Sequence, residues 1–159
     1  MNDLELLSHQ TDHVYRWLTS ATADVDFDAA CFARGERPSI AWLTGHLLVQ
    51  AEATAAAVCG LAQTAADLCG EAHFGCKRPA EWHALRASWR ARSACCLAAY
   101  EALEPRDLDR APLVELLPAF EVTLADRRRF WSGHVFHMGY HLGQLGSQRA
   151  ELGLGWWQA

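Results

Sequence analysis

The chain has 159 residues, of which 51% are hydrophobic and 21% charged, with a formal net charge of −5. This length suits one domain with a buried core, over residues 1–159, and the composition excludes a disordered or fibrous chain. The 19 acidic residues outnumber the 14 basic ones, so we expect no nucleic-acid partner. The compact basic run Arg127–Arg129 is interpreted as a solvated helix face.

No sequence signal for membrane insertion or export is apparent. No stretch reaches the roughly 18 consecutive apolar residues of a membrane span, so no membrane partner is expected. The acidic start Met1–Glu5 lacks the basic region of a signal peptide, and we expect a cytoplasmic protein. The six cysteines contain no Cys-x-x-Cys pair, and in a reducing compartment they are predicted to be small buried residues.

Alanine and leucine dominate the sequence and β-branched residues are sparse, which predicts an all-α fold. The first helix is expected over residues 2–20, because its apolar residues recur on one side. A second helix is expected over residues 40–59. Ser39 is a suitable N-cap for it, and Gly60 suits its end.

Two further helices complete the predicted set. The third is expected over residues 79–104, with Pro79 in its first turn, where a missing N–H costs nothing. The fourth is expected to begin between residues 121 and 123 and to continue to about residue 152, before Gly153. Four long helices with two lengthy connections predict a four-helix bundle with a long crossover connection.

Three histidines lie along the fourth predicted helix, at positions 134, 137 and 141. At about 100° per residue they share an arc of roughly 60° with apolar neighbours, so we expect their imidazoles to point into the core. Buried ring nitrogens need partners, and helical carbonyl groups are already used. A metal ion solves this, and the spacing of His137 and His141 suits one ion.

A third ligand is expected from the second helix, where His46 shares a side with Trp42 and Leu43. A single core histidine is more often a hydrogen-bonded structural residue, and that alternative applies to His46 alone. The three residues together predict a metal centre on His46, His137 and His141. Three ligands leave a coordination position open for water or substrate, as in catalytic sites.

The neighbours of this centre have two interpretations each. His134 precedes His137 by one helical turn, and is either a hydrogen-bonding partner of a ligand or a fourth ligand. Gln144 either orients a ligand imidazole or is a polar residue at the edge of the stripe. Trp42 lies one turn before His46 and either packs in the core or forms the wall of a pocket.

The remaining histidines and the C-terminal tryptophans carry less information. His9 and His13 lie away from the apolar side of the first helix and are predicted to be exposed. Trp156 and Trp157 are expected either to fold back on the bundle or to pack against another chain.

The segment Trp42-Leu-Thr-Gly-His46-Leu, followed by His137-x-x-x-His141-x-Gly-Gln144-Leu, resembles the DinB-like (damage-inducible, Dfs-type) metalloprotein superfamily over essentially the whole chain. The resemblance implies an up-down-down-up bundle that is often a homodimer. It also implies a divalent metal ion, zinc or nickel, on the three matching histidines. Leu142 stands where many relatives carry arginine, so the contacts of that arginine are not expected here.

The activity that this resemblance implies is a thiol S-transferase, because related members use bacillithiol or mycothiol, and one is a mycothiol-dependent isomerase. We therefore expect a low-molecular-weight thiol and an electrophile as small-molecule partners. A metal-dependent hydrolase and a non-catalytic metal-binding stress protein remain alternatives. Ligand type alone suits zinc, nickel, copper and iron. Ferritin-like di-iron chemistry fits poorly, because no Glu-x-x-His pair lies on a predicted core helix.

Overall fold

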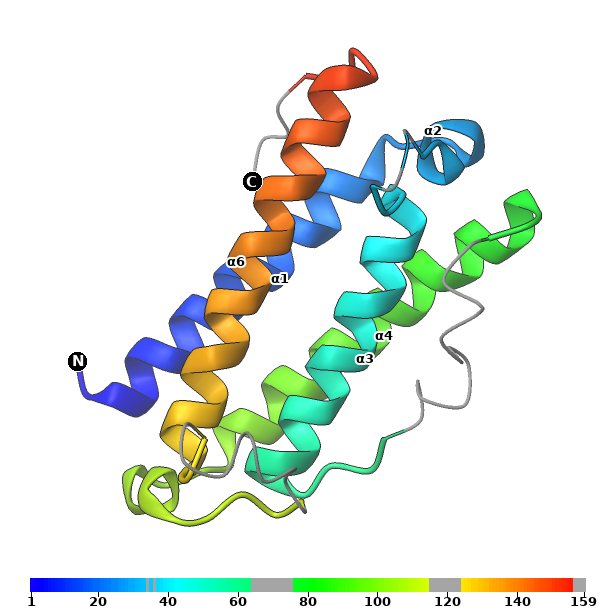
Figure 1. Cartoon of the computed structure of the whole chain (residues 1–159). Coiled ribbons are helices and arrows are strands. Elements are labelled where there is room, and N and C mark those ends of the chain that lie inside the picture. The colour runs from blue at the N-terminus through cyan, green and yellow to red at the C-terminus, as the bar shows by residue number, and fades with distance from the viewer. Residues whose placement is uncertain (34, 36, 64–75, 115–123, 156–159) are drawn as a thin grey trace.

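The computed structural model describes residues 1–33, 35, 37–63, 76–114 and 124–155 (Figure 1). All regular secondary structure in these residues is helical, as the composition predicts. The predictions for Trp156 and Trp157 concern residues outside these ranges. The same holds for Cys69 and for the expected helix start between residues 121 and 123.

Four long helices make up most of the described chain: α1 (Asp3–Ala23), α3 (Ile40–Cys59), α4 (Pro79–Glu101) and α6 (Arg127–Glu151). Two short elements lie within segments predicted as connections, namely α2 (Phe27–Cys31) and the 3-10 helix η2 (Pro105–Asp109). The long helices lie side by side in Figure 1, and their contacts form a ring. In this ring α1 packs against α4 and α6, and α3 packs against the same two helices.

Local capping explains where three of the long helices begin. The Asn2 side chain accepts a hydrogen bond from the Glu5 backbone N–H at 2.9 Å, and the Glu5 carboxylate accepts one from the Asn2 backbone N–H, also at 2.9 Å. At the start of α3, the Ser39 hydroxyl accepts a hydrogen bond from the Trp42 backbone N–H at 3.1 Å. At the start of α6, the Asp126 carboxylate accepts one from the Arg129 backbone N–H at 2.8 Å. At the end of α3, Gly60 takes a φ of 75°, which the missing Cβ makes easy.

The predicted helix bounds need three corrections. Helix α1 continues past Ser20 to Ala23, and α4 ends at Glu101 instead of residue 104. Helix α6 begins at Arg127, since residues 124–126 are not helical. The cap by Asp126 fixes that start, because its extended backbone ends the preceding segment and its carboxylate binds the first turn.

Three fully buried tryptophans, at positions 82, 89 and 131, fill the space between the helices. Each indole N–H finds an acceptor, as a buried indole requires. Trp131 donates to the Thr11 hydroxyl of α1 at 2.7 Å, and Trp89 donates to the Thr19 hydroxyl at 3.0 Å. Trp17 and Trp42 are only partly buried.

The basic run at the start of α6 is only partly a solvated face. Arg127 is buried, and its Nε donates to the Ala111 carbonyl oxygen at 3.1 Å. Arg128 forms ion pairs with Asp3 and with Asp109, the latter at 2.7 Å. The prediction was wrong for Arg127 because the chain after η2 returns to pack on the first turn of α6, a contact that helix periodicity does not reveal.

The burial of the cysteines in the described part of the chain differs from the prediction. Cys96 is buried, but Cys95 is exposed, because consecutive helical residues point about 100° apart and only one of them can face the core. Burial raises the pKa of the Cys96 thiol to about 12, with Glu52 adding to the shift. This thiol therefore stays protonated at neutral pH.

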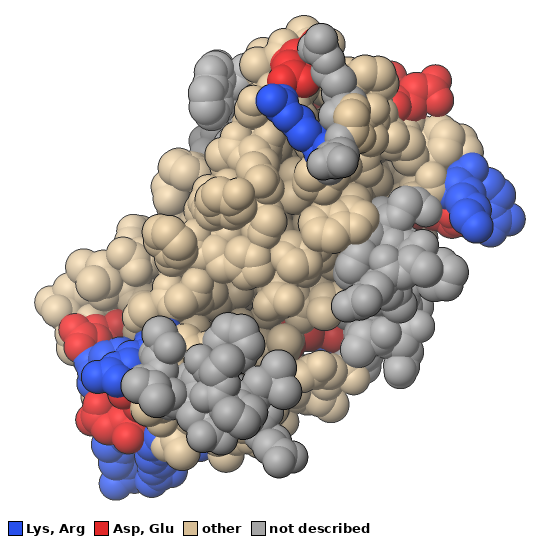
Figure 2. Space-filling view, viewed as in Figure 1, with Lys and Arg blue, Asp and Glu red and all other residues tan. Residues whose placement is uncertain are grey.

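No helix in the described ranges is both long enough and apolar enough to cross a lipid bilayer. Charged side chains gather toward the two ends of the face seen in Figure 2, and its middle is largely uncharged. Helix α6 contributes to this pattern, since it carries no charged residue from Phe130 to Gln148. It exposes 79% of Phe136 and 59% of Tyr140 to solvent.

Candidate metal centre

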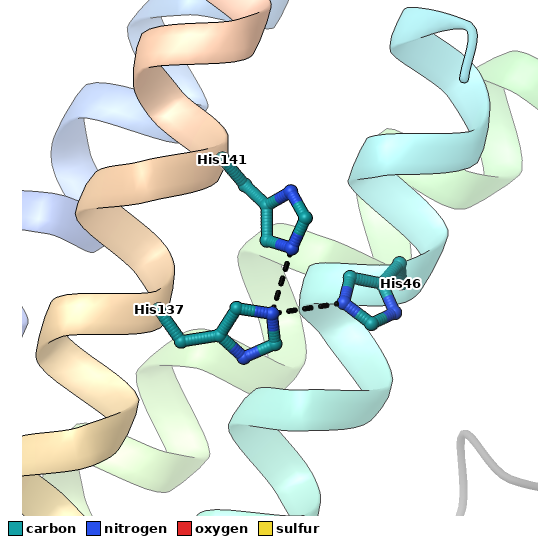
Figure 3. A group of neighbouring side chains, drawn as sticks. All are labelled: His46, His137 and His141. Atoms are coloured by element: carbon teal, nitrogen blue, oxygen red, sulfur yellow. Dashed lines mark hydrogen bonds between the residues drawn. The ribbon is translucent and has the colours of Figure 1, made fainter. Parts of the chain in front are cut away.

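Three histidine side chains meet in the space between α3 and α6 (Figure 3). The Nε2 atom of His137 lies 3.1 Å from Nε2 of His46 and 2.7 Å from Nε2 of His141. One ring nitrogen from each residue lies within 4.8 Å of the other two. The structure thus brings together the three residues that the sequence predicts as metal ligands.

The proton on His141 is positioned by Gln144, three residues further along α6. Nδ1 of His141 lies 2.7 Å from Oε1 of Gln144, and the Gln144 amide nitrogen donates to the Tyr140 hydroxyl at 3.1 Å. In this arrangement Nδ1 of His141 carries the proton, and its Nε2 presents a lone pair to the other two histidines. Gln144 therefore lies where the orienting interpretation requires.

Burial and electrostatic repulsion lower the pKa of two of these imidazoles, His46 and His137. The pKa of His46 is lowered to about 4, chiefly by burial and further by the neighbouring His141 and His137. The pKa of His137 is also lowered, by burial first and by His141 second. At neutral pH both rings are uncharged, which is the state in which imidazole binds a metal.

The donor set fits one divalent transition-metal ion. A neutral imidazole presents one ring-nitrogen lone pair, and the three Nε2 atoms lie close enough to present theirs toward one point. A single cation accepts all three lone pairs at once. The group found in the described residues consists of these three histidines, which are all partly exposed. Such a set suits zinc or nickel with room for a further ligand.

Trp42 forms one wall of this site. Its ring stacks on the imidazole of His46, with centroids 5.0 Å apart and planes inclined by 15°. Trp42 lies one turn before His46 on α3 and is partly exposed, so the pocket interpretation fits better than full core packing. The stacking restricts the rotation of the His46 ring and thereby fixes the direction of its lone pair.

His134 lies apart from the other two histidines of α6. It is 5% exposed, and its Nε2 lies 3.0 Å from the hydroxyl oxygen of Tyr15 on α1. The expectation that all three imidazoles point into the core is therefore wrong, because His137 and His141 are partly exposed and face α3. Helix α6 contacts both α1 and α3, so one stripe of the helix divides between two neighbours.

The burial of His134 predicts a pH-dependent stability. Burial, with a contribution from His137, lowers its pKa to about 3, against about 6.5 in an unfolded chain. Between these values the unfolded state binds more protons, so stability is fully present above pH 6.5 and falls as the pH drops. In the metal-free wild type, His134 should lower the free energy of unfolding by up to about 1.4 kcal/mol for each pH unit between pH 6 and 4. The His134→Phe variant should lack this part of the pH dependence.

This expectation is tested by urea unfolding of the metal-free wild type and His134→Phe across that pH range. The variant leaves the Tyr15 hydroxyl without its histidine partner, at a cost of about 1–3 kcal/mol. A double variant with Tyr15→Phe removes that cost and serves as the control. Parallel stability curves for the wild type and the double variant would contradict the assigned role of His134.

The sequence analysis assigned no contact to two tyrosines that meet histidines of α6. Tyr140 contacts the edge of the His141 ring at a centroid distance of 5.1 Å, and its spacing of four residues from Gln144 is a usable signal for their contact. Tyr15 and His134 are separated by 119 residues in the sequence, so no local pattern predicts their contact. His9 and His13 are exposed, as predicted.

No protein-family model matches this chain, and no curated protein shows a significant match to it. The class of the molecule therefore follows from its own geometry. In the part of the chain that the structure describes, it is a helical protein whose four long helices pack together and whose α3 and α6 hold a cluster of three histidines.

Proposed function

We propose that this protein is a DinB-like metalloprotein that binds one zinc or nickel ion on His46, His137 and His141 and transfers a low-molecular-weight thiol to an electrophile. The observation that carries the proposal is the convergence of three imidazole Nε2 atoms at a partly exposed position. The Trp42 and Gln144 contacts to two of these rings support it.

The proposal includes an up-down-down-up four-helix bundle with a long crossover connection. The ring of contacts in which α1 and α3 each pack against α4 and α6 is compatible with that topology. It also includes a cytoplasmic homodimer. The uncharged middle of α6, with Phe136 and Tyr140 exposed upon it, supports association between two copies.

In this proposal a bound divalent ion supplies positive charge that lowers the pKa of a coordinated thiol. The protein orients the imidazole rings that would bind the ion. Gln144 holds the proton of His141 on Nδ1, so that Nε2 stays a ligand atom. Trp42 fixes the His46 ring from one side and leaves the solvent side open for the thiol and the electrophile. Because the three ligands are neutral, the charge of the ion is not diminished by them.

The proposal predicts metal-dependent thiol transfer to chlorodinitrobenzene or monobromobimane. The thiolate sulfur forms a bond to carbon, the carbon–halogen bond breaks, and halide and the thiol proton leave to solvent. With zinc- or nickel-loaded protein and a panel of small thiols, we expect a rate well above that of the metal-free protein. The rate is expected to disappear in His46→Ala and to persist in His9→Ala, which alters an exposed histidine. Equal rates with and without metal would refute the transferase.

The neutrality of the ligand set also favours a second function, metal-dependent hydrolysis, because the same charge acidifies bound water. A panel of ester, amide and phosphate substrates separates the two activities. Turnover of the panel without thiol would favour the hydrolase. Stoichiometric metal binding with neither activity would favour a non-catalytic metal-binding protein.

A further inference from the structure

The seam between α3 and α6 continues beyond the histidines toward the start of α3. On α6 the residues that follow His141 on the same side are Gln144 and Gln148, at successive turns of the helix. On α3, Trp42 lies one turn before His46, and Pro38 precedes the helix. The side-chain amide of Gln148 donates to the Pro38 carbonyl oxygen, so the two elements are joined at this end.

A cavity of about 150 Å³ lies along this seam, next to the candidate metal centre. It is lined by Arg37, Pro38, Gln144, Ser147 and Gln148. Gln144 is shared between the cavity and the centre, because its Oε1 contacts the His141 ring. A molecule bound at the histidine cluster would therefore lie one side chain, Gln144, away from this polar cavity.

Arg37 gives this cavity its chemical character. Its side chain is 61% exposed and is paired with Glu151 at 2.5 Å. An exposed ion pair of this kind contributes little to stability, so the guanidinium can exchange Glu151 for a ligand carboxylate at small cost. The other lining side chains, two amides and a serine hydroxyl, are neutral hydrogen-bonding groups. The positive end of the α3 dipole lies at the same place and also favours an anion.

The spacing along α6 sets the size of the ligand. Gln148 is seven residues beyond His141, which corresponds to about 10 Å along the helix axis. A thiol held at the histidines that extends to the level of Gln148 would carry its acidic group about 10 Å from its sulfur. A cysteinyl residue followed by two further residues with a free carboxylate has this reach.

We infer that the cavity beside Arg37 is the subsite for a carboxylate at the far end of the thiol substrate, and that Arg37 selects acidic thiols of small-peptide size. This inference rests on the proposed thiol function. It predicts that the acidic thiol N-acetyl-Cys-Gly-Gly binds more tightly than the same peptide with a C-terminal amide. The two peptides differ only in the group that would meet Arg37.

The test is isothermal titration of zinc-loaded protein with each peptide. We expect the wild type to bind the acid about five to ten times more tightly than the amide, as one added charged hydrogen bond in a partly exposed setting allows. In Arg37→Gln the two peptides should bind equally, and the affinity for the amide should match the wild type. In Glu151→Gln, which releases Arg37 from its ion pair, affinity for the acid should rise.

Arg106→Gln is the matched control, because Arg106 is also an exposed arginine paired with a glutamate, and it lies outside the cavity lining. It should keep the preference of the wild type for the acid. Equal binding of acid and amide by the wild type, or a preference that survives in Arg37→Gln, would overturn the inference while leaving the thiol function standing. If neither peptide binds the zinc-loaded protein, the thiol function fails and this inference fails with it.

Discussion

Replacing His141 with alanine is expected to abolish the metal binding that we propose, from about one ion per chain to almost none. Two nitrogens would remain, and the turn of α6 would no longer offer two ligands to one ion. Loss of a residue that merely orients a ligand already lowers metal affinity about 10- to 100-fold, so loss of a ligand should exceed 100-fold. Elemental analysis of protein prepared with added zinc or nickel measures this effect.

Two further variants make the result specific. Gln144→Ala keeps all three ligands but removes the acceptor of the His141 Nδ1 proton. Its metal content should therefore lie between those of the wild type and His141→Ala. His13→Ala alters a histidine that is also helical but exposed and outside the cluster, and should retain full metal content. Equal metal content in the wild type and His141→Ala would eliminate the assigned site.

Replacing Arg149 with methionine is expected to destabilise the metal-free protein by about 3–5 kcal/mol. Arg149 is 1% exposed, and its guanidinium donates to both carboxylate oxygens of Asp24, at 2.6 and 2.8 Å. It also donates to the carbonyl oxygens of Ala21 at 2.7 Å, and of Leu154 and Gly155 at 3.2 Å. Methionine fills much of the volume but leaves these acceptors without their donor.

Urea unfolding of the metal-free protein measures this loss without a contribution from metal binding. Asp24→Ala should also destabilise, because it leaves a buried guanidinium without its carboxylate. Arg129→Met alters an exposed arginine of the same helix and should change stability by less than about 0.5 kcal/mol. A loss below about 1 kcal/mol in Arg149→Met would show that this buried network does not hold the ends of α1 and α6 together.

The helices and the pair on α6 could be predicted because their signals are local. Ser39 and Gly60 bound α3 where the sequence places them, and the interval between His137 and His141 is one helical turn whatever the rest of the chain does. The approach of His46 to this pair depends on how α3 packs against α6. The apolar residues around His46 in the sequence indicate a possible metal ligand, but the stronger support for this prediction is the resemblance to DinB-like proteins.

What the sequence could not supply was the division of one helical stripe between two neighbours. His134 and His137 share one arc of α6. Only the packing of α1 and α3 against α6 decides that His134 is buried against α1 and that His137 is partly exposed beside α3. The burial of Arg127 likewise depends on a chain return from η2. Helix α2 was a different kind of omission, since the Asp26 side chain accepts from the Ala29 backbone N–H at 2.8 Å and is a local cap.

The stacking of Trp42 on His46 has an optical consequence. An indole that lies parallel to an imidazole at 5.0 Å changes its emission when that imidazole gains a proton or another bonding partner. The tryptophans at positions 82, 89 and 131 are fully buried and each donates its own hydrogen bond, and Trp17 packs against His13 on α1, so their emission is common to the wild type and a Trp42 variant. The difference in fluorescence between the wild type and Trp42→Phe therefore isolates events at the histidine cluster, and the protein carries its own reporter of occupancy.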